Sequence, residues 1–111
     1  MYENLGLTAL KLERRDQAHA YLFKALQLNP RQPKALLEMA ELSYENRHYV
    51  PALDYYDRFS RLSDPDARSL LLGSRLARVF DEQGTVADLG QQLQRLYPGT
   101  PEYQQYLSEQ R

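Results

Sequence analysis

The chain has 111 residues, of which 42% are hydrophobic and 26% charged, so its length and composition fit one globular domain. The formal net charge of −1 provides no basic surface for nucleic acid, and the absence of cysteine excludes disulfides, thiol catalysis and thiolate zinc sites. The longest apolar run, Leu70–Leu72, is far shorter than the roughly 20 residues of a membrane span, and no signal peptide precedes Tyr2, so we expect no direct membrane insertion by this chain.

The sequence repeats itself at a constant interval. Tyr2, Leu5, Gly6 and Ala9 align with Leu36, Met39, Ala40 and Ser43, and Ala18, Leu22, Ala25 and Leu28 align with Ala52, Tyr56, Phe59 and Leu62. A period of about 34 residues, with two helices, small residues where they meet and a closing proline, is the tetratricopeptide signature. We therefore predict an all-α fold, a tetratricopeptide-repeat right-handed superhelix with three helix pairs and a C-terminal capping helix.

The period places the predicted helices, in chain order, at 2–13, 16–28, 33–46, 49–62, 67–81, 85–96 and 101–110. Pro33 and Pro101 lie where a proline opens a helix, and Thr100 is a predicted N-cap. Gly84 and Thr85 are interpreted as a helix stop followed by a cap. The helices form one predicted domain, 1–111, with repeats at about 1–32, 33–66 and 67–98 and a capping helix at 100–110.

The third repeat departs from the pattern in its second helix. Val86 stands where the repeat has alanine, and Gly90 stands where an aromatic side chain usually packs. We expect this helix to pack differently from its counterparts.

The two ends of the chain differ in kind. The last helix is amphipathic through Tyr103, Tyr106 and Leu107, as expected of a helix that closes a repeat array. Tyr2 already occupies the fourth position of its repeat, so the first repeat has no such cap. We expect the chain to be the C-terminal part of a longer array, and a homodimer through the uncapped first repeat stays open.

Candidate catalytic and metal-binding groups are few. His19 and His48 have no second ligand at a suitable spacing, and Asp54 and Asp57 form an ordinary solvated helix face. The five glycines are scattered and form no phosphate loop. The sequence therefore predicts a non-enzymatic protein with no catalytic residues, no cofactor and no metal.

The first helix of each pair in such arrays lines the concave side and holds peptide ligands. Transferred by position, the candidate groove residues are Leu7, Leu10, Lys11, Lys34, Leu37, Glu41, Tyr44, Arg68, Leu71, Arg75 and Arg78. Their aliphatic floor and charged edge suit a partly hydrophobic peptide or helix. The alternative, that the leucines only pack against the neighbouring repeat, is equally compatible with the sequence. Leu7 and Glu38 replace the asparagines of a chaperone-binding carboxylate clamp, which disfavours a chaperone-tail adaptor.

Three segments carry more than repeat consensus residues: YVPALDYYDRF, ARSLLLGSRLARVF and LQRLYPGTPEYQQYL. Over about residues 2–107 the chain resembles the type IV pilus biogenesis/stability lipoproteins of the PilF/PilW family. The resemblance implies an outer-membrane lipoprotein exposed to the periplasm. It also implies a pilotin, which binds the pilus secretin and helps it to localise and to multimerise. The lipidated cysteine and the N-terminal repeats of that family are not in this chain.

Two other readings stay open. The chain could be a tetratricopeptide adaptor of another cell-envelope or cytosolic complex, or a repeat module attached to an enzyme. The second of these fits poorly, because a catalytic domain would have to lie upstream.

Overall fold

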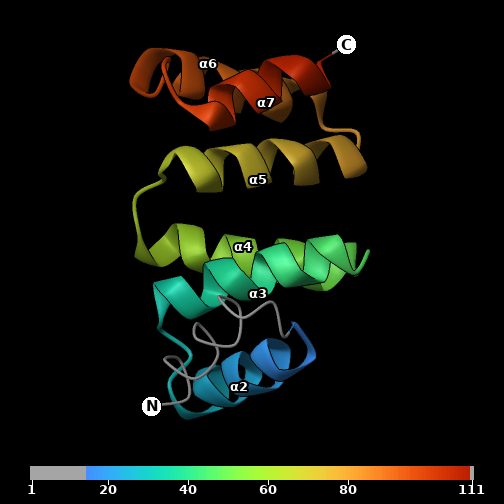
Figure 1. The fold of residues 1–111 in the computed structure, drawn as a ribbon, viewed down its shortest axis with the longest axis vertical. Coiled ribbons are helices and arrows are strands. Elements are labelled where there is room, and N and C mark those ends of the chain that lie inside the picture. Colours follow the sequence, from blue (N-terminus) through green and yellow to red (C-terminus); the bar gives the residue numbers. More distant parts are fainter. Residues whose placement is uncertain (1–14, 111) are drawn as a thin grey trace. The chain divides into compact units, whose positions relative to one another are not determined.

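The computed structural model describes residues 15–110, and every regular element in that part of the chain is an α-helix (Figure 1). The helices are α2 (Arg15–Leu28), α3 (Pro33–Glu45), α4 (Tyr49–Leu62), α5 (Ala67–Val79), α6 (Gln83–Leu96) and α7 (Pro101–Glu109). The predicted all-α fold is confirmed, and each described helix starts and ends within two residues of its predicted position. The predicted helix at 2–13 lies outside the described residues. Between residues 15 and 110, no helix has the length and apolar character needed to cross a membrane.

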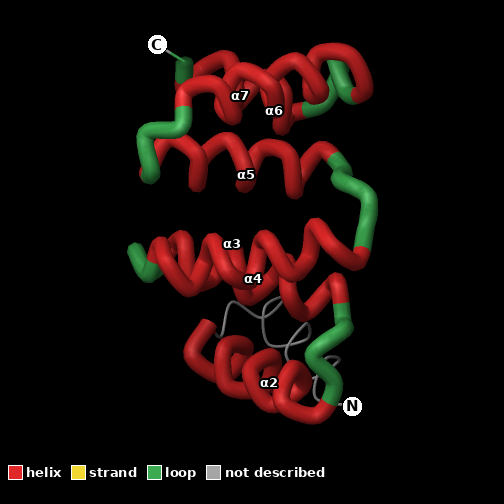
Figure 2. Tube along the Cα trace, turned by 180° about the vertical axis from the view of Figure 1, so that it is seen from behind, coloured by secondary structure: helices red, strands yellow, loops and turns green. Residues whose placement is uncertain are grey.

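The chain divides into two compact units between Ser63 and Asp64. In the first unit α3 packs along α4 and contacts α2, and in the second α5 packs along α6 while α7 contacts both (Figure 2). Each unit therefore contains one complete helix pair, α3 with α4 and α5 with α6, at the places that the sequence period predicts.

The turn inside each complete pair has the same backbone geometry. Arg47 and Asp81 adopt left-handed conformations, with φ of 63° and 57°, which are uncommon for residues other than glycine. In the first turn, the backbone N–H groups of Asn46, Arg47 and His48 donate to the carbonyls of Leu42, Tyr44 and Ser43, in that order. In the second turn, those of Phe80, Asp81 and Glu82 donate to the carbonyls of Leu76, Arg78 and Ala77, in that order. Every member of the second set lies one sequence period after its counterpart, so the structure repeats with the period of the sequence.

The predicted stop and cap at Gly84 and Thr85 are wrong. α5 ends at Val79, and α6 begins at Gln83, so both residues lie in the first turn of α6. The reversal is made earlier, by the left-handed backbone of Asp81, and no glycine is needed there.

The other predicted helix starts are confirmed. Pro33 and Pro101 are the first residues of α3 and α7. The Thr100 hydroxyl accepts a hydrogen bond from the Tyr103 N–H at 3.3 Å. The start of α5 is fixed by a capping box between Asp66 and Ser69, with both hydrogen bonds at 2.8 Å.

The predicted contact faces of the helices are buried. Ala18, Ala52 and Val86, one period apart, are each almost completely buried, and so are Ala25, Phe59 and Leu93. Ala52 lets α3 and α4 approach closely, whereas the corresponding position of α6 holds the larger Val86. This burial pattern is the one that the assigned register of the repeat predicts.

Candidate peptide-binding surface

The predicted groove residues of α3 divide into exposed and buried ones. Lys34 is exposed, and Glu41 and Tyr44 are half-buried, whereas Leu37 is only 6% exposed. The ring of Tyr44 lies 5.6 Å from that of Tyr49, which holds it against the end of the helix pair. A partner on this face would meet charged and aromatic side chains more than an aliphatic floor. Leu7, Leu10 and Lys11 lie outside the described residues.

On α5 the predicted aliphatic residue belongs to the core. Leu71 is 5% exposed and lies in a cluster with Leu70, Val86 and Leu93, while Arg68 is half-buried. Leu71 therefore packs within its own unit, among side chains of α5, α6 and α7.

The remaining two candidates, Arg75 and Arg78, contact the capping helix. Arg75 Nε and Nη2 donate to the carboxylate of Glu109 at 3.1 and 3.0 Å, and Arg78 Nη1 donates to it at 3.1 Å. Arg75 Nη2 also lies 3.4 Å from the side-chain oxygen of Gln105. Two guanidinium groups of α5 thus share one carboxylate of α7, and Arg75 holds it through two N–H donors, the paired geometry that suits a guanidinium and a carboxylate. A role for these arginines in binding a partner stays a prediction.

Tyr106 is the second anchor of α7. Its hydroxyl donates to the carbonyl of Val86 at 3.3 Å, and the Arg78 guanidinium lies 5.5 Å from the centre of its ring. The ring occupies the space beside Gly90, where a Cβ would overlap the phenol. Gly90, where α6 departs from the repeat pattern, therefore leaves a space that the Tyr106 ring of α7 fills. α7 thus supplies the aromatic ring that α6 lacks at this position.

The amphipathic face of α7 is evident from the sequence, but the side chains that this face contacts are not. Tyr103, Tyr106 and Glu109 follow one another at three-residue spacing, which places them on one side of a helix. Gly90, at the position where the repeat usually has an aromatic residue, could have indicated that a ring from another helix fills this space.

Two of the polar residues singled out in the sequence, Asp54 and His19, have structural partners. Asp54 lies 3.7 Å from Arg58, and His19 stacks on Phe23 with 6.4 Å between the ring centres. Burial raises the pKa of the Tyr55 phenol above its ordinary value of 10.0; the charge of Arg58 opposes this and that of Asp54 reinforces it. Over residues 15–110, no group of three or more histidine, cysteine, aspartate and glutamate side chains is placed to hold a metal ion.

Helix pairs that recur with the period of the sequence and share the same turn define a tetratricopeptide-type repeat protein. The chain is 51% identical over 109 residues to the type IV pilus assembly protein PilF of Pseudomonas aeruginosa, a match that covers 98% of this chain and 43% of that protein. A solved structure of Pseudomonas aeruginosa PilF matches with a TM-score of 0.95 at 52% identity, over 97% of this chain and 49% of the other.

The crystal structure of PilW, a type IV pilus biogenesis factor, matches with a TM-score of 0.77 at 28% identity, over 96% of this chain and 49% of the other. No protein-family model matches the sequence. The chain is a homologue of PilF and PilW and spans less than half the length of these relatives.

Proposed function

We propose that this chain is the non-enzymatic, protein-binding part of a pilotin for type IV pilus assembly. Its partner is a subunit of the outer-membrane secretin, which it helps to localise and to multimerise at the periplasmic face of the outer membrane. The observation that carries the proposal is the 51% identity to PilF over 98% of the chain. The secretin and the location rest on the family resemblance of the three segments described above.

The surface proposed for the partner is the face of the first helices. On α3 of the first unit, Lys34, Glu41 and Tyr44 present polar side chains, and Arg68 is the corresponding polar residue at the start of α5 in the second unit. Lys34 is the most accessible of these residues. Its charge at the start of α3 suits an acidic group on the partner.

The test is copurification of the secretin subunit with the gene product that contains this chain. The unaltered protein is expected to retain the secretin subunit. Lys34→Glu reverses a charge on the proposed surface and is expected to weaken the interaction at least about three-fold, mainly at low salt. Lys24→Glu makes the same change at an exposed position of α2 outside that surface, and it is expected to bind as the unaltered protein does.

Two results would count against the proposal. Equal binding by both variants and the unaltered protein would remove the α3 face from the interface. Retention of an unrelated envelope or cytosolic complex in place of the secretin would favour the adaptor alternative.

A further inference from the structure

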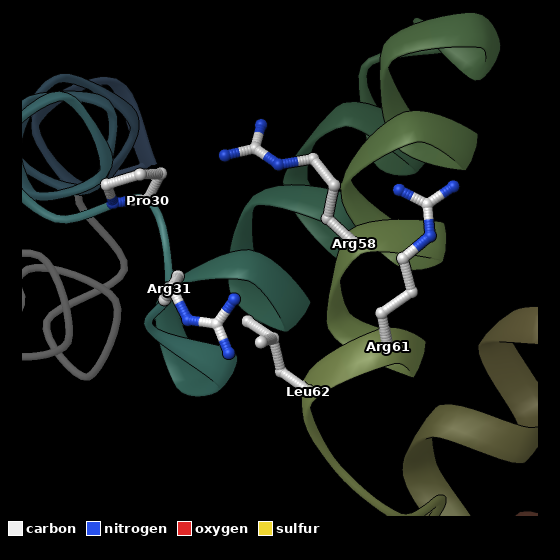
Figure 3. A pocket seen from close by; sticks show the side chains of 5 residues that line it. All are labelled: Pro30, Arg31, Arg58, Arg61 and Leu62. Atoms are coloured by element: carbon white, nitrogen blue, oxygen red, sulfur yellow. The ribbon is translucent and has the colours of Figure 1, made fainter.

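A pocket of about 230 Å³ lies in the first unit, between the α2–α3 loop and the last turns of α4. Its lining residues are Pro30, Arg31, Arg58, Arg61 and Leu62 (Figure 3). The loop contributes one arginine and α4 the other two. The guanidinium of Arg31 is turned towards Leu62, and that of Arg58 points towards Pro30. None of these residues belongs to the predicted groove.

The charge of the pocket is not balanced by its own lining. Arg58 has an ion pair with Asp54 at 3.7 Å, an exposed contact of two residues one helical turn apart. Within residues 15–110, the side chains of Arg31 and Arg61 make no ion pair. The chain as a whole carries a net charge of −1, so the positive charge of the three arginines is concentrated at this pocket and does not reflect a basic composition.

The remaining walls are apolar. Pro30 and Leu62 line the pocket beside the guanidinium groups. The Arg58 guanidinium lies 5.6 Å from the centre of the Tyr55 ring, a contact that restricts the freedom of this side chain before any ligand arrives. A ligand that fits must therefore combine negative charge with an apolar group.

Size and charge together select the class of ligand. The volume, about 230 Å³, falls below the range of roughly 300–1,000 Å³ typical of small-molecule sites, and it suits one or two side chains. Guanidinium groups bind carboxylates through paired N–H donors. Three arginines are fewer than the cluster of about four to eight basic residues that marks binding to an anionic membrane.

We propose that this pocket binds an acidic segment of a protein partner, in which carboxylates flank an apolar side chain. The carboxylates pair with Arg31 and Arg61, and the apolar side chain contacts Pro30 and Leu62. This inference goes beyond the proposed function, because it does not depend on whether the partner is a secretin and involves a different surface.

The test measures binding of a fluorescein-labelled EELEDLEE peptide to the 111-residue chain by fluorescence anisotropy. The unaltered chain is expected to bind this peptide more tightly than QQLQNLQQ, with an affinity that falls as salt is raised. Arg31→Gln with Arg61→Gln is expected to weaken binding by about ten-fold or more. Lys24→Gln with Arg95→Gln removes the same charge at two exposed positions outside the pocket, and it is expected to bind as the unaltered chain does.

Three results would overturn the proposal. These are equal affinity for the acidic and the amide peptide, equal loss in both double variants, and binding to mixed phosphatidylcholine and phosphatidylserine vesicles without binding to the peptide. Circular dichroism shows whether each variant is folded. If the pocket variant is not folded, a peptide titration of the unaltered chain followed by NMR decides instead. The backbone amides of Arg31, Arg61 and Leu62 must shift for the proposal to stand.

Discussion

Gly90 and Tyr106 show how one residue changes the packing of a repeat. Gly90 is buried in α6, and the phenol of Tyr106 lies where its Cβ would be. A glycine inside a helix costs about 1 kcal/mol relative to alanine, so helix propensity alone favours alanine here. Steric overlap opposes alanine, because an added Cβ would force the Tyr106 ring out of its position and break its contacts with Val86 and Arg78.

Gly90→Ala is therefore expected to lower stability by about 1–3 kcal/mol, because overpacking outweighs the gain in propensity. Thermal unfolding followed by circular dichroism measures the change. Gly84→Ala is the matched control, since Gly84 lies in the same helix with open space around it and is expected to be neutral or slightly stabilising. A Gly90→Ala variant that melts as high as the control would show that Tyr106 does not need this space.

Ala52 tests the register of the repeat. It is completely buried within the first unit, on the face of α4 that the period predicts to be closely packed. Ala52→Leu is expected to cost about 1–3 kcal/mol, read from a urea denaturation curve. Val50→Leu, at an exposed position of the same helix, is expected to leave the curve unchanged. No effect at Ala52 would mean that the assigned register is wrong.

At the scale of the element, α7 depends on its neighbours. It has nine residues, too few for a stable helix in isolation, where about 12–15 residues are already marginal. α7 is attached through the Tyr106 ring and through the ion pairs of Glu109 with Arg75 and Arg78. Because the side chains of these ion pairs are partly exposed, we expect a stabilisation between that of a surface ion pair and that of a buried one.

Glu109→Gln is expected to destabilise the docked α7 by about 1–2 kcal/mol, because two guanidinium groups lose their shared carboxylate. Hydrogen exchange of the α7 amides measures this local opening. The difference from the unaltered chain is expected to shrink in about 1 M salt. Asp88→Asn removes an exposed charge on α6 and serves as the control; equal protection of α7 in both variants would contradict the role of Glu109.

The helices were predictable because their signals are local and recur. Proline at the start of α3 and α7, and buried small residues one period apart, located the elements to within two residues. The start of α6 was missed because a left-handed aspartate, Asp81, made the turn that a glycine was expected to make. The contact of Arg75 and Arg78 with Glu109 was not predicted, because it depends on how α7 packs against α5, and this packing cannot be derived from the repeat period.

At the scale of the whole molecule, the described helices form tetratricopeptide-type repeats, and the chain is 51% identical to PilF over 109 residues. The chain matches 43% of the length of PilF, so its role is best tested inside a complete protein. The central claim is that this segment can do the work of the matching segment of a pilus assembly protein.

The direct test replaces the matching segment of Pseudomonas aeruginosa PilF with this chain, in cells that lack their own PilF, and counts surface pili. The hybrid protein is expected to restore surface pili together with secretin multimers. A segment carrying Gly90→Ala and Glu109→Gln is expected to restore fewer. Cells that accumulate the folded hybrid at the normal level and still lack surface pili would contradict the account.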